Sequence, residues 1–208
     1  MPEYQLYGRH QTGVMSVQAL MAEGGIAHVY HDVPRPRTHA ETEALARINP
    51  RLQVPVLIHP DGTVITEGPA ILSHLADAHP ALRLIPAPGS TARARHDRWT
   101  AFFHANVYEA MLRELAPARY TDDPEGADKI ASSATAYVRR HYQLFEAELG
   151  DGPYLTGAGM QVFDLYLWML CYWIDAQWLA AHCPRIDRLW KTAAERPALA
   201  RIAREHFG

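Results

Sequence analysis

A proline stands between two apolar residues of high strand propensity at Val54-Pro55-Val56. Proline has no backbone N–H, so it does not fit inside a sheet ladder, and Val54-Pro55 is expected at a strand edge. If the Val54–Pro55 bond is cis, the chain turns sharply and the backbone N–H and C=O of Val54 stay available to an extended ligand. About 5–6% of X–Pro bonds in folded proteins are cis, so the sequence leaves the isomer open.

A second strand, Thr63 to Thr66, leads directly into Glu67 and Gly68. A helix is expected next, because Pro69 suits the first turn of a helix. The exposed backbone donors and the dipole at such a helix start favour a carboxylate ligand. Together the two segments suit an extended ligand that carries a carboxylate.

Periodic apolar residues and turn signals predict the element order βαβαββα in the amino-terminal part. The expected strands are residues 4–7, 26–33, 56–59 and 63–66, and the expected helices are 14–23, 41–48 and 69–78. A linker rich in proline and glycine follows at 80–90. Beyond it the pattern predicts helices only, at 91–116, 127–149, 162–181, 185–194 and 197–206. We therefore expect an α/β domain at 1–80 and an all-α domain of five to six helices at 90–208.

Composition narrows the function classes. The net charge of −3 and the lack of a basic run argue against a nucleic-acid partner. The longest apolar stretch, Phe163 to Ile174, contains Asp164 and is too short for a bilayer span, and the start lacks a secretory signal. The two cysteines form no C-x-x-C pair, which favours free thiols in a reducing cytoplasm. None of the twelve histidines has metal-site spacing, so no metal is expected.

The Val54-Pro55 and Glu67-Gly68 segments resemble the amino-terminal, thioredoxin-like domain of the glutathione S-transferases, from Gln5 to about His79. The resemblance continues more loosely to about residue 195. It implies that the Val54 backbone, before a cis Pro55, pairs with the cysteinyl part of glutathione. It also implies that Glu67 takes the γ-glutamyl amino group. The family usually has a serine after that acid, so at Gly68 only the N–H remains for the γ-glutamyl carboxylate.

The resemblance also implies contacts at the other end of glutathione and at the second substrate. Gln53 stands where the family often contacts the glycyl end. Arg37 and His39 are candidates for the glycyl carboxylate, since either supplies a charge-assisted donor. Tyr108 lies on a helix that in the family borders the electrophile pocket, and we expect its hydroxyl to donate to the electrophile or its leaving group. His104 and Met111, on the same stripe, are expected in the core.

The loop from Gly8 to Gly13 corresponds to the turn that presents a tyrosine, serine or cysteine to the glutathione sulfur in the family. Thr12 fits best, because Thr-Gly resembles the Ser-Gly pair of bacterial members; a shift of one residue would place Gln11 there. His10, as a base, is a further candidate. One hydrogen bond to a charged group contributes roughly 1.5–3 kcal/mol, which would lower the pKa of the thiol by about one or two units. The alternative is that Thr12 only caps the helix.

The resemblance therefore implies a bacterial-type cytosolic glutathione transferase with glutathione as co-substrate. It would form the thiolate for attack on a small apolar electrophile, as in detoxification, and assemble as a homodimer. The alternatives are a glutathione-dependent peroxidase or disulfide reductase, and a catalytically silent binding protein. The sequence does not identify the electrophile, because its pocket is built from helices whose detailed structure the sequence does not determine.

The family's buried helix that carries Asp164 usually begins with a serine or threonine cap, and Gln161 replaces that residue here. The Asp164 carboxylate is still expected to accept from the Gln161 N–H.

Overall fold

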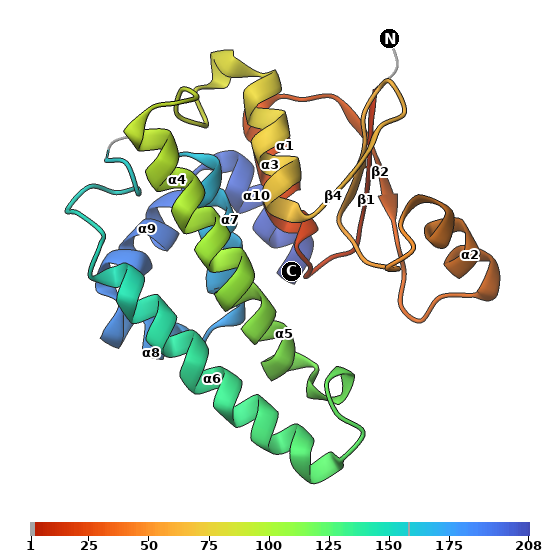
Figure 1. Cartoon of the computed structure of the whole chain (residues 1–208). Helices are drawn as coiled ribbons and strands as arrows, with labels where there is room; N and C mark the ends of the chain where they lie inside the picture. Colours follow the sequence, from red (N-terminus) through yellow and green to blue (C-terminus); the bar gives the residue numbers. More distant parts are fainter. Residues whose placement is uncertain (1–2, 158) are drawn as a thin grey trace. The chain divides into compact units, whose positions relative to one another are not determined.

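The computed structural model describes residues 3–157 and 159–208 (Figure 1). The chain divides into two compact units. The first comprises the chain up to Ile85 together with Ala193–Gly208, and the second comprises Pro86–Thr192. Within the described part of the chain, no helix is both long and apolar enough to cross a membrane.

The first unit is built on a four-stranded mixed sheet. Its strands are β1 (Tyr4–Gly8), β2 (His28–Asp32), β3 (Val56–Ile58) and β4 (Val64–Thr66), in the order β2-β1-β3-β4. Strand β1 runs parallel to β2 and antiparallel to β3, and Leu6 pairs with both Tyr30 and Leu57. Leu6 and Leu57 are fully buried, which explains why the two apolar strands lie at the centre of the sheet.

Three helices complete the predicted βαβαββα order: α1 (Val14–Gly24), α2 (His39–Ile48) and α3 (Gly68–Ala78). Helices α1 and α3 cover one face of the sheet, and α2 lies on the other (Figure 1). Helix α1 packs very closely on β1, because a Cβ added to Gly8 would lie 2.4 Å from the Cγ2 atom of Val14. Glycine at position 8 thus brings the loop before α1 tight against the sheet.

The last helix, α10 (Pro197–Phe207), belongs to this first unit. It contacts α1 and buries Leu199 and Ile202, and Arg196 just before it forms a 2.5 Å ion pair with Glu23. This differs from the expected division, in which residues 90–208 form one helical domain. The apolar face of α10 is covered by α1, a contact that residue spacing along the chain does not reveal.

The second unit is all-helical. Its helices are α4 (Thr91–Phe102), α5 (Glu109–Leu115), α6 (Pro124–Glu146), α7 (Val162–Leu170), α8 (Ala176–His182) and α9 (Pro184–Ala194). The core contains Phe103, Tyr142, Phe145 and Phe163, whose rings meet edge to face. The predicted fold class is confirmed: a thioredoxin-like βαβαββα domain and a helical part.

Two predicted helices are interrupted. Between α4 and α5 the chain is π-helical over Phe103–Tyr108, within the single helix expected at 91–116. The helix expected at 162–181 is broken by a 3-10 turn at Cys171–Trp173, and α8 begins afresh after Asp175. The Asp175 carboxylate accepts from the Trp178 N–H at 2.6 Å, so a side-chain cap makes this second start.

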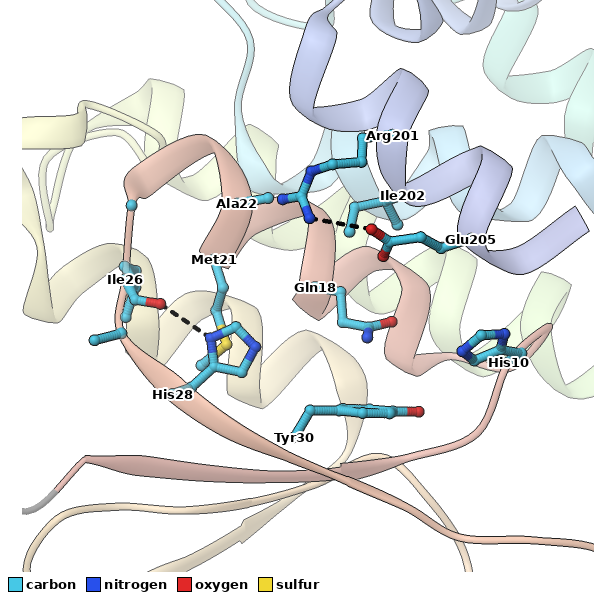
Figure 2. Close-up of a pocket in the computed structure, with 12 residues that line it drawn as sticks. His10, Gln18, Met21, Ala22, Ile26, His28, Tyr30, Arg201, Ile202 and Glu205 are labelled. Atoms are coloured by element: carbon cyan, nitrogen blue, oxygen red, sulfur yellow. Dashed lines mark hydrogen bonds and ion pairs between the residues drawn. The ribbon is translucent and has the colours of Figure 1, made fainter. Parts of the chain in front are cut away.

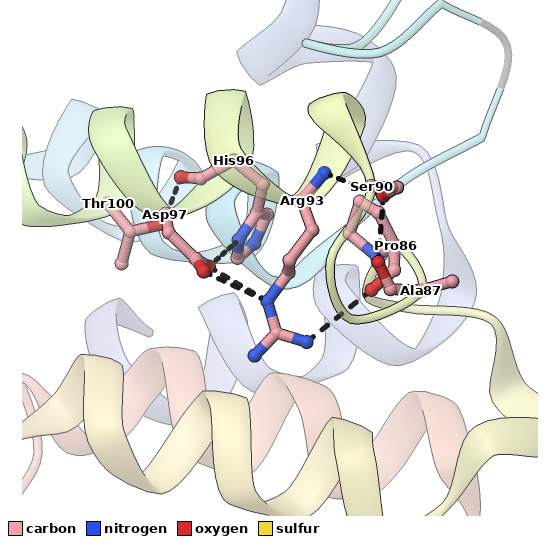
Figure 3. Close-up of polar contacts among 7 residues, drawn as sticks. All are labelled: Pro86, Ala87, Ser90, Arg93, His96, Asp97 and Thr100. Atoms are coloured by element: carbon pink, nitrogen blue, oxygen red, sulfur yellow. Dashed lines mark hydrogen bonds and ion pairs between the residues drawn. The ribbon is translucent and has the colours of Figure 1, made fainter.

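The proline-rich linker is fastened to the start of α4 (Figure 3). Ser90 caps the helix by accepting from the Arg93 N–H at 3.1 Å. The Arg93 guanidinium donates to the Pro86 carbonyl at 3.4 Å and to the Asp97 carboxylate at 3.0 Å. These bonds link residues 86–90 to α4 and explain why the second unit begins at Pro86.

Candidate active site

The Val54–Pro55 peptide bond is cis. Strand β3 begins after it, with Val56 paired to Tyr7 of β1. Among the hydrogen bonds of the described residues, none involves the backbone N–H or C=O of Val54. Pro55 is buried and Val54 is half-buried, and the backbone of Val54 lies just before the first paired residue of β3, a central strand of the sheet.

A buried asparagine holds the chain just before this segment. The Asn49 side chain donates to the Gln53 carbonyl at 2.8 Å and accepts from the Arg51 N–H at 3.1 Å. Between them Leu52 has a φ of +56°, which is unusual for a residue with a Cβ. Sequence reasoning did not single out Asn49; the available signal was an Asn-Pro pair at the end of an expected helix.

Glu67 immediately precedes α3 and has a φ of +66° and a ψ of 113°. Such a backbone costs of the order of 1–3 kcal/mol and is typical of ligand-binding sites when the surrounding structure maintains it. One Glu67 carboxylate oxygen lies 2.8 Å from the Arg51 guanidinium, with both side chains partly exposed. Gly68 is the buried first residue of α3. An acid, a cation and a helix start therefore lie together, and the role of Arg51 was missed from sequence.

The two candidates for the glycyl carboxylate have different positions. The Arg37 guanidinium lies 3.5 Å from the Leu52 carbonyl, beside the segment that leads to Gln53 and Val54. His39 is strongly exposed on α2 and pairs with Glu43 at 3.3 Å. The structure brings Arg37 to the Val54 segment and leaves His39 on the outer surface of its helix.

The loop between β1 and α1 is held by its own hydrogen bonds. The Thr12 hydroxyl donates to the Arg9 carbonyl at 2.6 Å, and the Thr12 carbonyl accepts from the Met15 N–H at 3.1 Å. Gly13 occupies the cap position of α1, and no side chain caps this end. The Thr12 hydroxyl thus closes the loop rather than capping the helix.

Gln11 and His10 are directed to α10. The Gln11 N–H donates to Nδ1 of His206 at 2.9 Å, and its side-chain amide donates to the His206 carbonyl at 3.0 Å. The His10 ring stacks on the His206 ring at a centroid distance of 5.0 Å. Of the three predicted candidates for the sulfur, Gln11 and His10 thus contact His206 of α10, whereas the Thr12 hydroxyl bonds within its own loop.

Tyr108 is half-buried and lies in the second unit, in a cluster of aromatic rings. Its ring centroid is 6.3 Å from that of Tyr166 and 5.9 Å from that of Trp173. His104 was expected in the core, but it is half-buried and lies 3.0 Å from the Tyr166 hydroxyl. Met111 is buried, as expected. The π-helical turn that carries His104 and Tyr108 is a feature often found at functional sites.

A separate pocket of about 520 Å³ lies within the first unit, between α1, β2 and α10. Figure 2 shows Tyr30 and His28 of β2 opposite Gln18 of α1, with the Arg201–Glu205 pair of α10 above them. The Tyr30 hydroxyl is buried and has no hydrogen-bond partner among the described atoms. Burial and then the nearby Asp32 raise the pKa of Tyr30 to about 12, so this phenol stays protonated. Sequence reasoning did not anticipate this pocket.

The cysteines supply no reactive thiolate. Cys171 and Cys183 are free and buried, and burial raises the pKa of Cys171 well above its usual value and that of Cys183 to about 12. Within the described ranges, no group of three or more His, Cys, Asp and Glu side chains is arranged to hold a metal ion.

Residues 15–78 match the family model of the glutathione S-transferase N-terminal domain. The protein "Glutathione S-transferase GstA" of Escherichia coli O157:H7 is 28% identical over 151 residues, which is 72% of either chain.

Two solved structures extend the likeness over the whole fold. A sphingomonad glutathione S-transferase complexed with glutathione has 26% identity and a TM-score of 0.81, covering 97% of this chain and 98% of that one. A glutathione transferase homolog from Sulfitobacter, with bound glutathione, has 22% identity and a TM-score of 0.86, covering 99% of each chain. The family model, the relative and the shared fold agree: residues 15–78 match the N-terminal domain of the glutathione S-transferases, and the whole chain is similar to proteins of that family in sequence and fold.

Proposed function

We propose that this protein binds glutathione and activates its thiol for attack on a small apolar electrophile. The observation that carries the proposal is Glu67, an acid kept in a left-handed backbone conformation at the start of α3, 2.8 Å from Arg51. The γ-glutamyl end of glutathione carries one ammonium and one carboxylate. An acid beside a helix start matches that pair of charges. The glutathione bound in the sphingomonad relative supports the same ligand class.

The remaining contacts follow the length of the tripeptide. The Gly68 N–H would donate to the γ-glutamyl carboxylate, and Arg51, which pairs with the neighbouring Glu67, would supply a positive charge for the same carboxylate. The backbone N–H and C=O of Val54 would pair with the cysteinyl residue in the manner of an added strand. Gln53 and Arg37 would meet the glycyl end, and charge-assisted bonds of this kind are stronger than neutral ones.

Thiol activation is assigned to Thr12 and to the amino end of α1. The hydroxyl would donate to the thiolate, and the helix dipole would favour the same charge. Catalysis would consist of thiolate formation and proximity, with no covalent enzyme intermediate. Tyr108 would act on the electrophile side. The family resemblance also supports a cytoplasmic homodimer with a role in detoxification.

A catalytically silent glutathione-binding protein is the second candidate. One observation favours it: the Thr12 hydroxyl already donates to the Arg9 carbonyl. Turnover of a chlorinated nitroarene separates the transferase from the silent protein. Reduction of a hydroperoxide would instead indicate the peroxidase alternative.

The binding test is calorimetric titration with glutathione, using Glu67→Gln and a matched control. Loss of a charged hydrogen-bond partner costs about 1–3 kcal/mol, so Glu67→Gln should weaken binding by about five- to 150-fold. Glu43→Gln removes the same charge from another exposed site of the first unit, where Glu43 pairs with His39. It should leave the affinity unchanged. Wild-type protein that gives no heat with millimolar glutathione would exclude the proposed function.

A further inference from the structure

The ring of His206 on α10 is hydrogen-bonded at both nitrogens. Nδ1 accepts from the Gln11 N–H at 2.9 Å, and Nε2 lies 2.7 Å from the side-chain oxygen of Gln18 on α1. A backbone N–H only donates and an amide oxygen only accepts, so the ring is neutral and carries its hydrogen on Nε2. With 4% of its surface exposed, His206 joins the loop before α1 to α1 itself.

His206 holds Gln11, a residue whose backbone conformation needs support from its surroundings. Gln11 has a φ of +58°, in the left-handed region that residues with a Cβ disfavour. Its side-chain amide also donates to the His206 carbonyl at 3.0 Å. The same histidine thus fixes both the backbone and the side chain of Gln11, and surrounding contacts of this kind allow strained backbone to persist.

Gln11 is bonded directly to Thr12, so its backbone conformation sets the direction of that residue. The Thr12 hydroxyl then bonds the Arg9 carbonyl, and the Thr12 carbonyl bonds the Met15 N–H. From this geometry we infer that His206 is a positioning residue: acting through Gln11, it holds the Gly8–Gly13 loop so that Thr12 and the amino end of α1 face the glutathione sulfur. The inference rests on the proposed function.

The groups around His206 keep it neutral. The His10 ring stacks on it, and α10 also carries Arg201 and Glu205, which pair with each other at 3.1 Å. Burial, and then the charge of His10, lower the pKa of His206 to about 4. Because the histidine of the unfolded chain takes up this proton near its usual pKa of 6.5, the stabilising contribution of neutral His206 is complete above that pH. It is lost as the pH falls towards 4, so His206 holds the loop at neutral pH.

Two substitutions distinguish the hydrogen bond at Nδ1 of His206 from the one at Nε2. The side-chain oxygen of His206→Asn lies near the position of Nδ1 and preserves the acceptor for the Gln11 N–H. His206→Gln reaches the position of Nε2, preserves a contact with Gln18 and removes that acceptor. Ile202→Ala is the matched control, because Ile202 is buried on the same face of α10 with 3% exposure. It loosens α10 without removing a bond to the loop.

The experiment compares these variants by turnover, by the pH titration of bound glutathione thiolate, and by melting temperature. Loss of one buried hydrogen bond predicts that His206→Gln lowers kcat by about three- to tenfold and raises the pKa of the bound thiol, with KM for glutathione within about twofold. His206→Asn should keep kcat and the pKa of the bound thiol near the wild-type values. Ile202→Ala should lower the melting temperature but leave the pKa of the bound thiol unchanged. Equal effects in His206→Gln and Ile202→Ala, or none in His206→Gln, would overturn the inference.

Amide hydrogen exchange at Gln11 is measured without glutathione, so it tests the positioning role of His206 independently of the proposed glutathione binding. The Gln11 N–H should be protected in wild type and His206→Asn and should exchange rapidly in His206→Gln. If glutathione does not bind to wild type, the proposed function fails, and this measurement still decides whether His206 holds the loop. Equal exchange in all three proteins would overturn that role.

Discussion

The Thr12 hydroxyl offers the sharpest test of how the thiol is activated, because its hydrogen already has a partner. It donates to the Arg9 carbonyl at 2.6 Å, and that bond must break before the hydroxyl can donate to a thiolate. A neutral hydrogen bond contributes about 0.5–1.5 kcal/mol and one to a charged group about 1.5–3 kcal/mol, so the net gain is about 1 kcal/mol. We therefore expect Thr12→Val to raise the pKa of bound thiol by about 0.7 units. The sequence-based expectation was about one to two units, because it had no competing acceptor.

The assay is the absorbance of bound glutathione thiolate against pH. Thr12→Val keeps the shape of the side chain and deletes the donor, and Thr12→Ser is the control that keeps the hydroxyl. Wild type and Thr12→Ser should titrate together, with Thr12→Val displaced to higher pH. If the Thr12→Val curve coincides with wild type, the hydroxyl stays on Arg9 and a different group stabilises the thiolate.

Two further predictions concern stability and assembly. Asp164 is fully buried and accepts from the Leu155 N–H at 3.0 Å and the Gln161 N–H at 2.8 Å. Asp164→Ala leaves both donors unsatisfied and should lower the free energy of unfolding in urea by about 2–5 kcal/mol, whereas a loss below about 1 kcal/mol would contradict this reading. The proposed homodimer predicts a light-scattering mass near twice the 23.4 kDa of one chain, and a mass of one chain at micromolar concentration would count against it.

Much of the fold is local in origin and could be predicted. The strand and helix order follows from apolar periodicity, and the Thr63–Thr66 strand leads Glu67 to a helix start in the structure as it does in the sequence. The position of Val54-Pro55 just before β3, outside its ladder of hydrogen bonds, is in keeping with the missing proline N–H. The bond from the Gln161 N–H to Asp164 also spans only three residues. Each of these features depends on neighbours within one turn or one hairpin.

The fine structure of the candidate site depends on contacts between distant residues. Gln11 and His206 are 195 positions apart, and their bonds decide that Gln11 turns towards α10. The Arg51–Glu67 pair joins residues 16 positions apart across the two segments of the expected site. Residue types alone do not select such partners, because many donors and acceptors along the chain are chemically equivalent. Sequence therefore determined the type and order of the elements, whereas the tertiary structure interrupted two of the expected helices. Tertiary packing also decided which polar groups meet, and with them the direction in which Thr12, Gln11 and Glu67 point.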